Sequence, residues 1–534
     1  MLKKGQNKTA MRRSIAAYAV VFLSAAAVCA FLQGQSSFAD PDSFYHAKMA
    51  SLMLESGPVM TFSWLPFTTL TEAFADHHLF YHVLLMPFVA LFGPLWGIKL
   101  AAILFAAAAV TVFLGVLRMM RVSHAWVFTL LLMTSGGFLV RLNLAKAGPL
   151  AIILLLSAVV ALKRRHLGWL FAIGWVYVWT HGGWPLLPLM VSCWLAARIL
   201  TRAVTERAAE RRRTVTLWES KALAATLAGC LAGLVINPYF PGNLSFYWEQ
   251  IVQVGLIGYG ETIAVGSEWY PYYFSGLFGE NGGPFLALGI VILIALFALL
   301  WDDVIRQPSR VRIAESEIVD AIGLCLTSAA LLFMTAGSRR HVEYLIPVLI
   351  LFTASCFGML WPHLDLVRLR QRFSSLFSSK VVALSLTVFL LSVLPVLALK
   401  QVYLVKYFLG AGVPWGHYGS AVQWVSENVP EGSVIVHSDW DDFPMLFFRD
   451  DRYSYVAGLD PTFLYRRNPL KYGRWRALTL GEYDGSVSGS LRDDFGSRVL
   501  LIGKDHEEMK SLAERDGALV LTYEDEDAWI YEIP

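Results

Sequence analysis

Charged residues are scarce in this chain of 534 residues. Asp, Glu, Lys and Arg together make up 16% of it, whereas hydrophobic residues make up 56%. A soluble protein of this size would not tolerate that balance, so the composition predicts a polytopic membrane protein. The formal net charge of +3 says little by itself, and no nucleic acid is expected as a partner.

Cysteine is also scarce, and its positions exclude a disulfide framework. The chain has five cysteines, all inside apolar runs and none in the polar C-terminal tail. Cysteines in such surroundings behave as small core hydrophobes.

Apolar runs long enough to cross a bilayer recur along the chain. A spanning helix needs about 20 apolar residues, and several of these runs are at the short end. We expect about eleven spans, at residues 13–33, 97–117, 124–141, 147–163, 166–181, 184–200, 220–236, 284–301, 316–335, 341–361 and 380–400. The first run has no clear cleavage site and is interpreted as an uncleaved span rather than a signal peptide.

The distribution of basic residues predicts the orientation of these spans. Basic sites such as "LRMMR" (117–121) and "KRRH" (163–166) should face the cytoplasm. If the shorter run 79–93 also crossed, the next basic sites would fall outside. We therefore expect 79–93 to be a juxtamembrane helix, with the N-terminus in the cytoplasm and the C-terminus outside. The protein is expected in a bacterial or archaeal plasma membrane.

The composition divides the chain into two domains. Residues 1–400 are predicted to form a transmembrane domain with outer loops at 34–96 and 237–283. Residues 401–534 are more polar and alternate helix-like with strand-like stretches, which predicts a small extracytoplasmic α/β domain. The strand-like runs are 433–437, 498–503, 518–523 and 528–533.

Acids and histidines gather in the first outer loop. "DPDSFYH" contains Asp40, Asp42 and His46, and "FADHHLFYH" contains Asp76, His77 and His78. A carboxylate near the bilayer is costly unless it is paired or hydrated. It can serve as a general base, or Asp and His together can bind a divalent cation. The alternative is that the acids are solvated and the histidines lie at the interface.

Four basic residues break the expected orientation pattern. Arg141, Lys146, Arg339 and Arg340 all fall on the predicted outer side. An anionic lipid headgroup would explain cations in this position. The alternative is an ion pair with Glu343 or another loop acid.

These motifs resemble the GT-C superfamily of polyprenyl-phosphate-dependent glycosyltransferases. "DPDSFYH" in the first outer loop is similar to the D-x-D motif of that superfamily. "FADHH" is similar to a metal-binding motif of archaeal oligosaccharyltransferase catalytic subunits, which lies in a later loop there and here maps onto Asp76 and His78. The stretch around "HSDWDD" looks like the start of the oligosaccharyltransferase outer domain, although Asp439-Trp440-Asp441-Asp442-Phe443 stands where that family has Trp-Trp-Asp-Tyr-Gly.

The sequence and the resemblance together predict a membrane glycosyltransferase. It would move a sugar or glycan from a polyprenyl-(di)phosphate donor to a glycan, lipid or protein acceptor outside the cell. The expected catalytic residues are Asp40, Asp42, Asp76 and Glu268. The donor phosphate would meet Arg339, Arg340, Arg141 and Lys146. A divalent metal, Mn or Mg, would be held by Asp40, Asp76 and His78.

Other functions remain open from the sequence alone. One is an oligosaccharyltransferase that acts on protein, and another is a non-enzymatic lipid or glycan transporter. A transporter predicts ionisable residues inside its spans, whereas the acids of interest here gather at the outer face. A scaffold protein would not explain the acids between residues 40 and 76.

Overall fold

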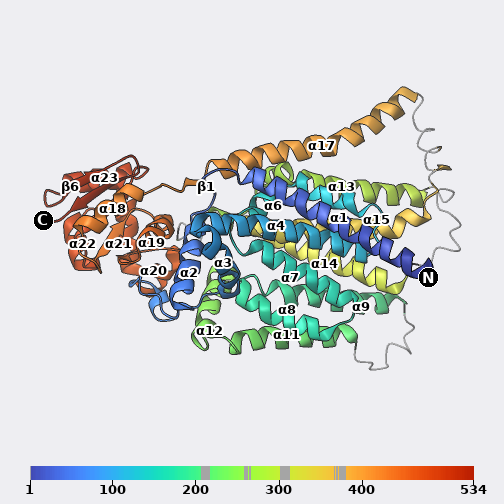
Figure 1. Cartoon of the computed structure of the whole chain (residues 1–534), viewed down its shortest axis with the longest axis horizontal. Coiled ribbons are helices and arrows are strands. Elements are labelled where there is room, and N and C mark those ends of the chain that lie inside the picture. Colours follow the sequence, from blue (N-terminus) through green and yellow to red (C-terminus); the bar gives the residue numbers. More distant parts are fainter. Residues whose placement is uncertain are drawn as a thin grey trace.

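The chain forms a long bundle of helices with a smaller sheet-containing domain at one end (Figure 1). The computed structural model describes residues 2–205, 217–257, 263, 266–300, 313–365, 367–368, 371 and 380–534. The N-terminal end of α1 lies at the far end of the bundle. The short helices α2, α3 and α12 (Gly242–Tyr247) lie beside the sheet-containing domain.

The long apolar helices form the body of the bundle. In the part of the chain that is described, seven are long and apolar enough to cross a membrane, or up to eight if one bent pair counts as a span. This supports a polytopic membrane protein without confirming about eleven spans, partly because α7 and α8 have only 16 and 14 residues. The helices are α1 (Leu2–Leu32), α4 (Pro94–Met119), α7 (Gly148–Lys163), α8 (Leu167–Thr180), α9 (Leu186–Thr205), α11 (Trp218–Val235), α13 (Phe274–Leu300), α14 (Glu315–Gly337), α15 (Val342–Leu360) and α17 (Lys380–Gly410).

The predicted span at residues 124–141 is not one continuous helix. Helix α5 (Ala125–Leu130) and the 3-10 turn η2 (Leu131–Thr134) are followed by α6 (Gly136–Leu142) at an angle of 89°. Ser135 adopts an extended conformation and caps α6 by accepting a hydrogen bond from the backbone N–H of Phe138. Polar Ser135 before two glycines breaks the helix, and α6 then leads directly to Arg141 and Lys146.

Helices α8 and α11 approach each other closely through small residues. A side chain at Gly229 would come within 2.1 Å of the carbonyl oxygen of Phe171, and one at Gly233 within 2.8 Å of that of Trp175. Glycines four residues apart let two membrane helices pack backbone to backbone. This packing fixes the C-terminal end of α8, where His181 enters the site described below.

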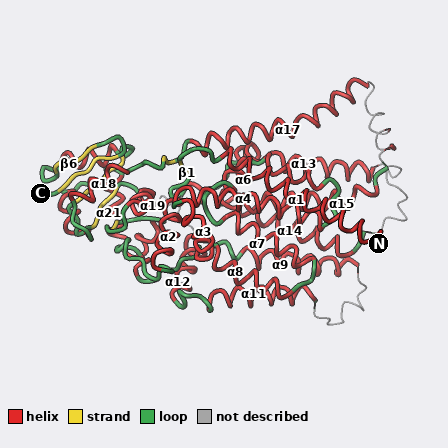
Figure 2. Tube along the Cα trace, in the orientation of Figure 1, coloured by secondary structure: helices red, strands yellow, loops and turns green. Residues whose placement is uncertain are grey.

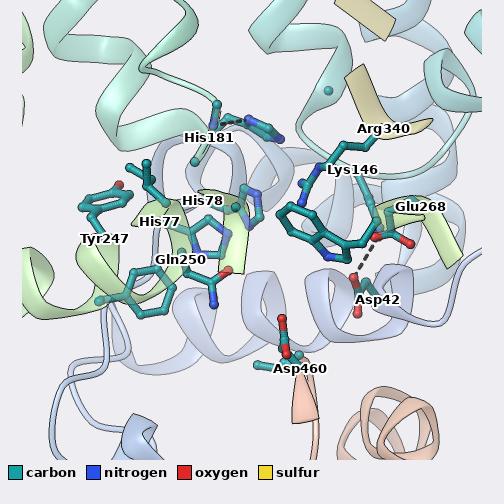
Figure 3. A pocket seen from close by; sticks show the side chains of 18 of the residues that line it. Asp42, His77, His78, Lys146, His181, Tyr247, Gln250, Glu268, Arg340 and Asp460 are labelled. Atoms are coloured by element: carbon teal, nitrogen blue, oxygen red, sulfur yellow. Dashed lines mark hydrogen bonds and ion pairs between the residues drawn. The ribbon is translucent and has the colours of Figure 1, made fainter. Parts of the chain in front are cut away.

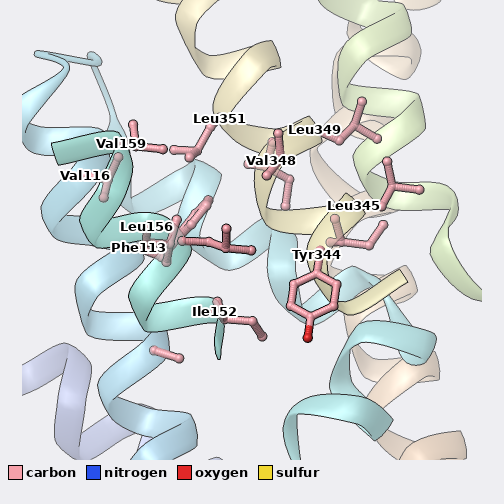
Figure 4. Close-up of a cluster of buried hydrophobic side chains, with 14 of the residues drawn as sticks. Phe113, Val116, Ile152, Leu156, Val159, Tyr344, Leu345, Val348, Leu349 and Leu351 are labelled. Carbon is pink, nitrogen blue, oxygen red and sulfur yellow. The ribbon is translucent and has the colours of Figure 1, made fainter. Parts of the chain in front are cut away.

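Aliphatic side chains from three helices fill the centre of the bundle (Figure 4). Residues such as Phe113 of α4, Leu156 of α7 and Leu345 of α15 are almost fully buried. Their burial removes apolar surface from contact with water and lipid and holds α7 against α15. The N-terminal ends of these two helices therefore meet at the end of the bundle nearest the sheet-containing domain.

The first loop forms short helices at that same end. Helix α2 (Asp42–Ser56) is followed by η1 (Thr69–Thr71) and by α3 (Leu79–Phe92), which ends at Gly93 with φ of 75°. Only glycine adopts that φ without strain, so the chain turns sharply into α4. Helix α3 has 14 residues and lies beside α2 in Figure 1, where a juxtamembrane helix was predicted.

A five-stranded sheet organises the C-terminal part, where the strands in Figure 2 are confined to one end of the molecule. The strand order is β4-β3-β5-β7-β6, with β4, β3 and β5 parallel and β7 and β6 antiparallel. All four predicted strands are present. The elements are β3 (Val434–His437), α19 (Phe443–Arg449), β4 (Ser454–Tyr455), α20 (Pro461–Arg467), α21 (Pro469–Thr479), α22 (Val487–Phe495), β5 (Val499–Gly503), α23 (Glu507–Arg515), β6 (Val520–Glu524) and β7 (Ala528–Glu532), preceded by α18 (Gly419–Asn428).

A small antiparallel ribbon joins the first loop to this sheet-containing domain. Strand β1 (Ser37–Phe38) pairs with β2 (Val413–Pro414), which follows α17. The predicted domain boundary after residue 400 falls inside α17, because this helix continues to Gly410. Lys99 donates to the carbonyl of Ser37 at 2.9 Å and lies over the ring of Trp415, so α4 anchors both strands of the ribbon.

The two ends of the bundle provide a test of the predicted orientation. Glu55, exposed at the end of α2, lies at the domain end, whereas exposed Arg164 follows the opposite end of α7. In a variant without the native cysteines, Glu55→Cys should react with a membrane-impermeant maleimide in intact cells. Arg164→Cys should react only after permeabilisation. Labelling of Arg164→Cys from outside would contradict the orientation.

Candidate functional site

A cavity of about 380 Å³ lies where the helical bundle meets the sheet-containing domain. Its walls come from α2, the connection between α6 and α7, the π-helix η3 (Trp248–Ile257), η4 (Ser267–Trp269), η7 (Arg339–His341) and α20. Among the predicted site residues, Asp42, His78, Arg141, Lys146, Glu268 and Arg340 line it. Segments far apart in the sequence therefore meet in one cavity (Figure 3).

Lys146 joins the two carboxylates of the first motif. Its Nζ lies 2.7 Å from Asp40 Oδ2 and 2.8 Å from Asp42 Oδ2. Asp40 also accepts a hydrogen bond from the backbone N–H of Asp42 at 2.9 Å, which holds the start of α2. Asp42 lines the cavity. Asp40 does not, but it bonds the same Lys146 ammonium group.

The surroundings give these groups different proton affinities. Burial raises the pKa of Asp42, the Lys146 ammonium opposes this rise, and the Asp40 charge adds to it. Burial alone would lower the pKa of Lys146, but Asp40 and Asp42 raise it above its ordinary value, so the amine stays charged. A carboxylate with a raised pKa is a stronger base than an ordinary one.

Glu268 has the opposite character. Burial would raise its pKa, but Lys146, Arg340 and Arg141 together lower it to about 2. A carboxylate with so low a pKa stays ionised and is a poor proton acceptor at neutral pH. The predicted catalytic residue Glu268 is therefore placed among the cations of the site as their counter-charge.

Arg340 lies over the ring of Trp269, with its guanidinium carbon 4.2 Å from the ring centroid. Within the described residues it makes no ion pair. An arginine that stacks on an aromatic face keeps its N–H groups available for an oxyanion. Arg340 is thus the cation of the cavity best placed for an anionic ligand.

The neighbouring Arg339 points elsewhere. Its Nε donates to the carbonyl of Pro271 at 3.2 Å, and its guanidinium lies over Tyr272. It does not line the cavity. The prediction that both arginines of this pair contact the donor phosphate is therefore not supported for Arg339.

Arg141 pairs with Glu343. Its Nε lies 3.1 Å from Glu343 Oε2, and both side chains are nearly buried. The ion pair that was considered as an alternative for the basic residues thus exists, but with Arg141. Its Nη groups make no hydrogen bond or ion pair with the described residues, and they remain available to a ligand.

The second motif forms a separate chain of hydrogen bonds. Asp76 Oδ2 lies 2.7 Å from His82 Nδ1, and His82 Nε2 lies 2.8 Å from His46 Nδ1. Asp76 Oδ1 accepts the backbone N–H of His78 at 3.0 Å. Asp76 is thus buried behind the cavity wall, whereas His46 and His78 line the cavity. Burial holds the pKa of both imidazoles well below its ordinary value.

The predicted metal ligands do not fit a metal site. Within the described residues, no group of three or more His, Cys, Asp or Glu side chains is arranged to hold a metal ion. Asp40 bonds Lys146, and Asp76 bonds His82, so both carboxylates of the proposed set already have partners. The Lys146 ammonium also supplies the positive charge that a cation would bring to Asp40 and Asp42.

The sheet-containing domain contributes residues that sequence reasoning missed. Asp460, the N-cap of α20, and Phe463 line the cavity. Burial, followed by the charges of Asp42, Asp439 and Asp40, raises the pKa of Asp441 to about 9, so this carboxyl group is protonated at neutral pH. In the sequence, the acidic run "DWDD" around Asp441 was the available signal. Its neighbours in the structure, Asp40 and Asp42, lie some 400 residues away in the chain.

Three solved structures share the arrangement of this chain. Archaeal oligosaccharyltransferase AglB from Archaeoglobus fulgidus matches with a TM-score of 0.61 and 14% identity, covering 93% of this chain and 71% of AglB. ArnT from Cupriavidus metallidurans, bound to undecaprenyl phosphate, matches with a TM-score of 0.54 and 15% identity, covering 97% of this chain and 98% of ArnT. Arabinofuranosyltransferase AftD from Mycobacteria matches with a TM-score of 0.55 and 12% identity, covering 97% of this chain and 40% of AftD.

No protein-family model and no curated protein matches the sequence. The chain shares its fold with these three proteins. This is the kind of fold that the resemblance of the first motif implies. Because identity is at most 15% among these three, the likeness shows the fold alone.

Removal of the Lys146 charge should destabilise the protein. Lys146→Met leaves Asp40 and Asp42 as neighbouring carboxylates without their cation, which should cost about 3 kcal/mol. We expect a lower midpoint in thermal unfolding of the purified protein in detergent. Adding Asp40→Asn and Asp42→Asn to Lys146→Met should recover much of the loss, because no unpaired charge remains. A single variant as stable as the parent would contradict the ion-pair analysis.

Proposed function

We propose that this protein is a membrane glycosyltransferase. It moves a sugar or glycan from a polyprenyl-phosphate or polyprenyl-diphosphate donor to an acceptor on the extracytoplasmic face. The observation that carries the proposal is the grouping of Arg141, Lys146 and Arg340 with Asp40 and Asp42 around one cavity. Cations for a phosphate leaving group and a candidate base are what such a transfer needs.

The donor phosphate would lie against Arg340 and Arg141. Arg340 has no ion-pair partner among the described residues, and Arg141 uses only Nε in its bond to Glu343. Arginine binds phosphate with two parallel hydrogen bonds, which fixes both position and orientation. The polyprenyl chain would lie along the apolar helices of the bundle. ArnT, which shares the fold, binds undecaprenyl phosphate.

The Asp40 and Asp42 pair would supply the base. An acceptor hydroxyl oxygen attacks the anomeric carbon, and the bond from that carbon to the phosphate oxygen breaks. The phosphate leaves with the bonding electrons, and the hydroxyl proton passes to the Asp42 carboxylate at the cavity wall. Asp40 and Lys146 hold Asp42 in place. Because the residues present do not form a metal site, no step here depends on a metal.

The acceptor would approach from the sheet-containing domain. Asp460 and Phe463 of this domain already line the cavity. A glycan, a lipid or a protein could present the hydroxyl or amine that is glycosylated. With the orientation predicted above, the whole site lies outside the cytoplasm, and the N-terminus lies inside.

The proposal is tested by incubating purified protein with undecaprenyl-phosphate monosaccharides. Cell-envelope extract is added as a source of acceptor. We expect release of undecaprenyl phosphate, detected by mass spectrometry, with at least one donor. If no donor is consumed and undecaprenyl phosphate does not bind to the protein, the proposed function is wrong.

Adjacent arginines give a matched pair of variants for the phosphate site. Arg340→Ala should reduce transfer efficiency roughly tenfold to a hundredfold, because a charge-assisted hydrogen bond to phosphate is worth about 1.5–3 kcal/mol. Arg340→Lys should recover only part of this, since lysine offers a point charge. Arg339→Ala should have little effect, because this side chain is bound to Pro271 and Tyr272. Equal losses in both alanine variants would contradict the assignment.

The base is tested by Asp40→Asn and Asp42→Asn. Both substitutions keep the shape of the side chain. Asp42→Asn removes the proton acceptor, so transfer should be nearly abolished, whereas Asp40→Asn weakens the contact with Lys146 that positions Asp42 and should reduce transfer less. Binding of undecaprenyl phosphate should persist, which separates chemistry from donor binding and from misfolding. Near-normal turnover in Asp42→Asn would remove Asp42 as the proton acceptor.

A further inference from the structure

The cavity has two walls of different chemistry (Figure 3). Asp42, Lys146, Glu268 and Arg340 lie together on one side. His77, His78, Tyr247 and Gln250 lie on the other, and Asp460 lies below. We call the second group, together with His46 and His181, the histidine wall. All its members line the cavity.

The chain from Asp76 to His46 determines which nitrogen of His46 carries a proton. A carboxylate can only accept hydrogen bonds, so Asp76 accepts one from the backbone N–H of His78 and one from His82 Nδ1–H. In the neutral form of His82, Nε2 carries no proton and accepts from His46 Nδ1. In a neutral imidazole with Nδ1 protonated, Nε2 is a bare acceptor. His46 thus offers the cavity a hydrogen-bond acceptor held by two buried partners.

Gln250 offers the complementary group. Its Nε2 amide is buried and has no hydrogen-bond partner among the residues that the structure describes. A buried donor without a partner is energetically unfavourable, so it marks a position where a ligand can supply the missing acceptor. Gln250 and His46 both line the same cavity, one as a donor and the other as an acceptor.

Flat apolar faces accompany these polar groups. Phe246 of the bundle and Phe463 of α20 stack with ring centroids 6.1 Å apart and planes at 23°. The His77 ring lies 5.1 Å from Phe246 at 33°. Aromatic faces with a few placed donors and acceptors suit a ring that has C–H faces and hydroxyl edges.

The groups of the histidine wall do not favour an anion, because the cations Lys146 and Arg340 lie on the other wall (Figure 3). Lys146 pairs with two carboxylates there, and Arg141 bonds Glu343 through Nε. Asp460 adds a carboxyl group beneath the histidine wall. A carboxylate sugar would meet this group and neutral imidazoles, whereas a hydroxyl can donate to Asp460 and to His46 Nε2.

We propose that the histidine wall is a carbohydrate subsite, in which Gln250 and the Asp76–His82–His46 chain bind the hydroxyls of a sugar ring that carries no acidic group. The inference rests on the proposed function and adds the substrate class to it. The ring belongs either to the lipid-linked donor or to a glycan acceptor, since both present the same hydroxyl chemistry.

Binding measurements on the purified full-length protein test the subsite. The probes are undecaprenyl phosphate, undecaprenyl-phosphate glucose and the corresponding glucuronate. A free glucose oligosaccharide is also measured with undecaprenyl phosphate present. Tighter binding of the glucose lipid than of the bare lipid identifies a donor sugar. Binding of the oligosaccharide identifies an acceptor. The glucuronate lipid should bind more weakly than the glucose lipid.

Gln250→Leu should remove the extra affinity for the sugar. We expect about threefold to tenfold weaker binding of the sugar-bearing probe, which is the value of one hydrogen bond, and unchanged binding of undecaprenyl phosphate. Gln423→Leu, on the exposed face of α18, is the matched control and should change neither. If undecaprenyl phosphate itself does not bind the parent protein, the proposed function is wrong. If it binds but Gln250→Leu leaves sugar binding unchanged, the assignment of the carbohydrate subsite is wrong.

Asp76→Asn tests the hydrogen-bond chain without removing a side chain. An amide can donate to His82 Nδ1, which reverses the chain and turns His46 Nε2 from an acceptor into a donor. The same substitution logic is known from serine proteases, where an Asp-to-Asn change imposes the wrong histidine tautomer. We expect loss of sugar-dependent affinity with bare-lipid binding retained. Retained preference for glucose over the bare lipid would overturn the role of this chain.

Discussion

The Lys146 ammonium between Asp40 and Asp42 is the interaction on which the site depends. None of these charges could be buried alone at this depth, because desolvation of an unpaired ion costs several kcal/mol. Together they tie the start of α2 to the connection between α6 and α7. That tie closes one wall of the cavity, keeps Asp42 facing it, and places a cation beside Glu268, whose pKa falls as a result.

The site is shared between the helical bundle and the sheet-containing domain. The ribbon of β1 and β2 brings the two together next to Asp40. Lys48 of α2 pairs with Asp451 at 2.9 Å, and Trp64 donates to the carbonyl of the same residue at 2.8 Å. These contacts join the two parts of the molecule, and Asp460 and Phe463 complete the cavity. A domain that contacts both the base and the cavity can select the acceptor without altering the phosphate-binding side.

The fold is shared with proteins that have little sequence in common with this chain. Fold alone does not define a substrate, because function resides in the groups placed on it. The groups placed on this side of the cavity are the Asp76–His82–His46 hydrogen bonds and the Gln250 amide, which has no partner among the described residues. They lie opposite Arg340 and give the cavity one side for a phosphate and another for a neutral ring.

The sequence by itself determined the class of protein and the motifs. Scarce charge and long apolar runs require a membrane protein, because apolar helices of that length are stable only in lipid. The sequence also predicted that Asp42 and Lys146 lie on the same outer side, whereas their contact came only from the structure. Only the tertiary structure decided which neighbour each group has. Arg339 and Arg340 are adjacent in sequence, yet one bonds Pro271 and the other lies over Trp269 inside the cavity. Likewise, Asp76 satisfies His82 rather than a metal. Arg339 and Pro271 are 68 residues apart in the sequence, and the pairing of Asp76 with His82 depends on how the chain folds into α3. Local sequence patterns do not encode such pairings.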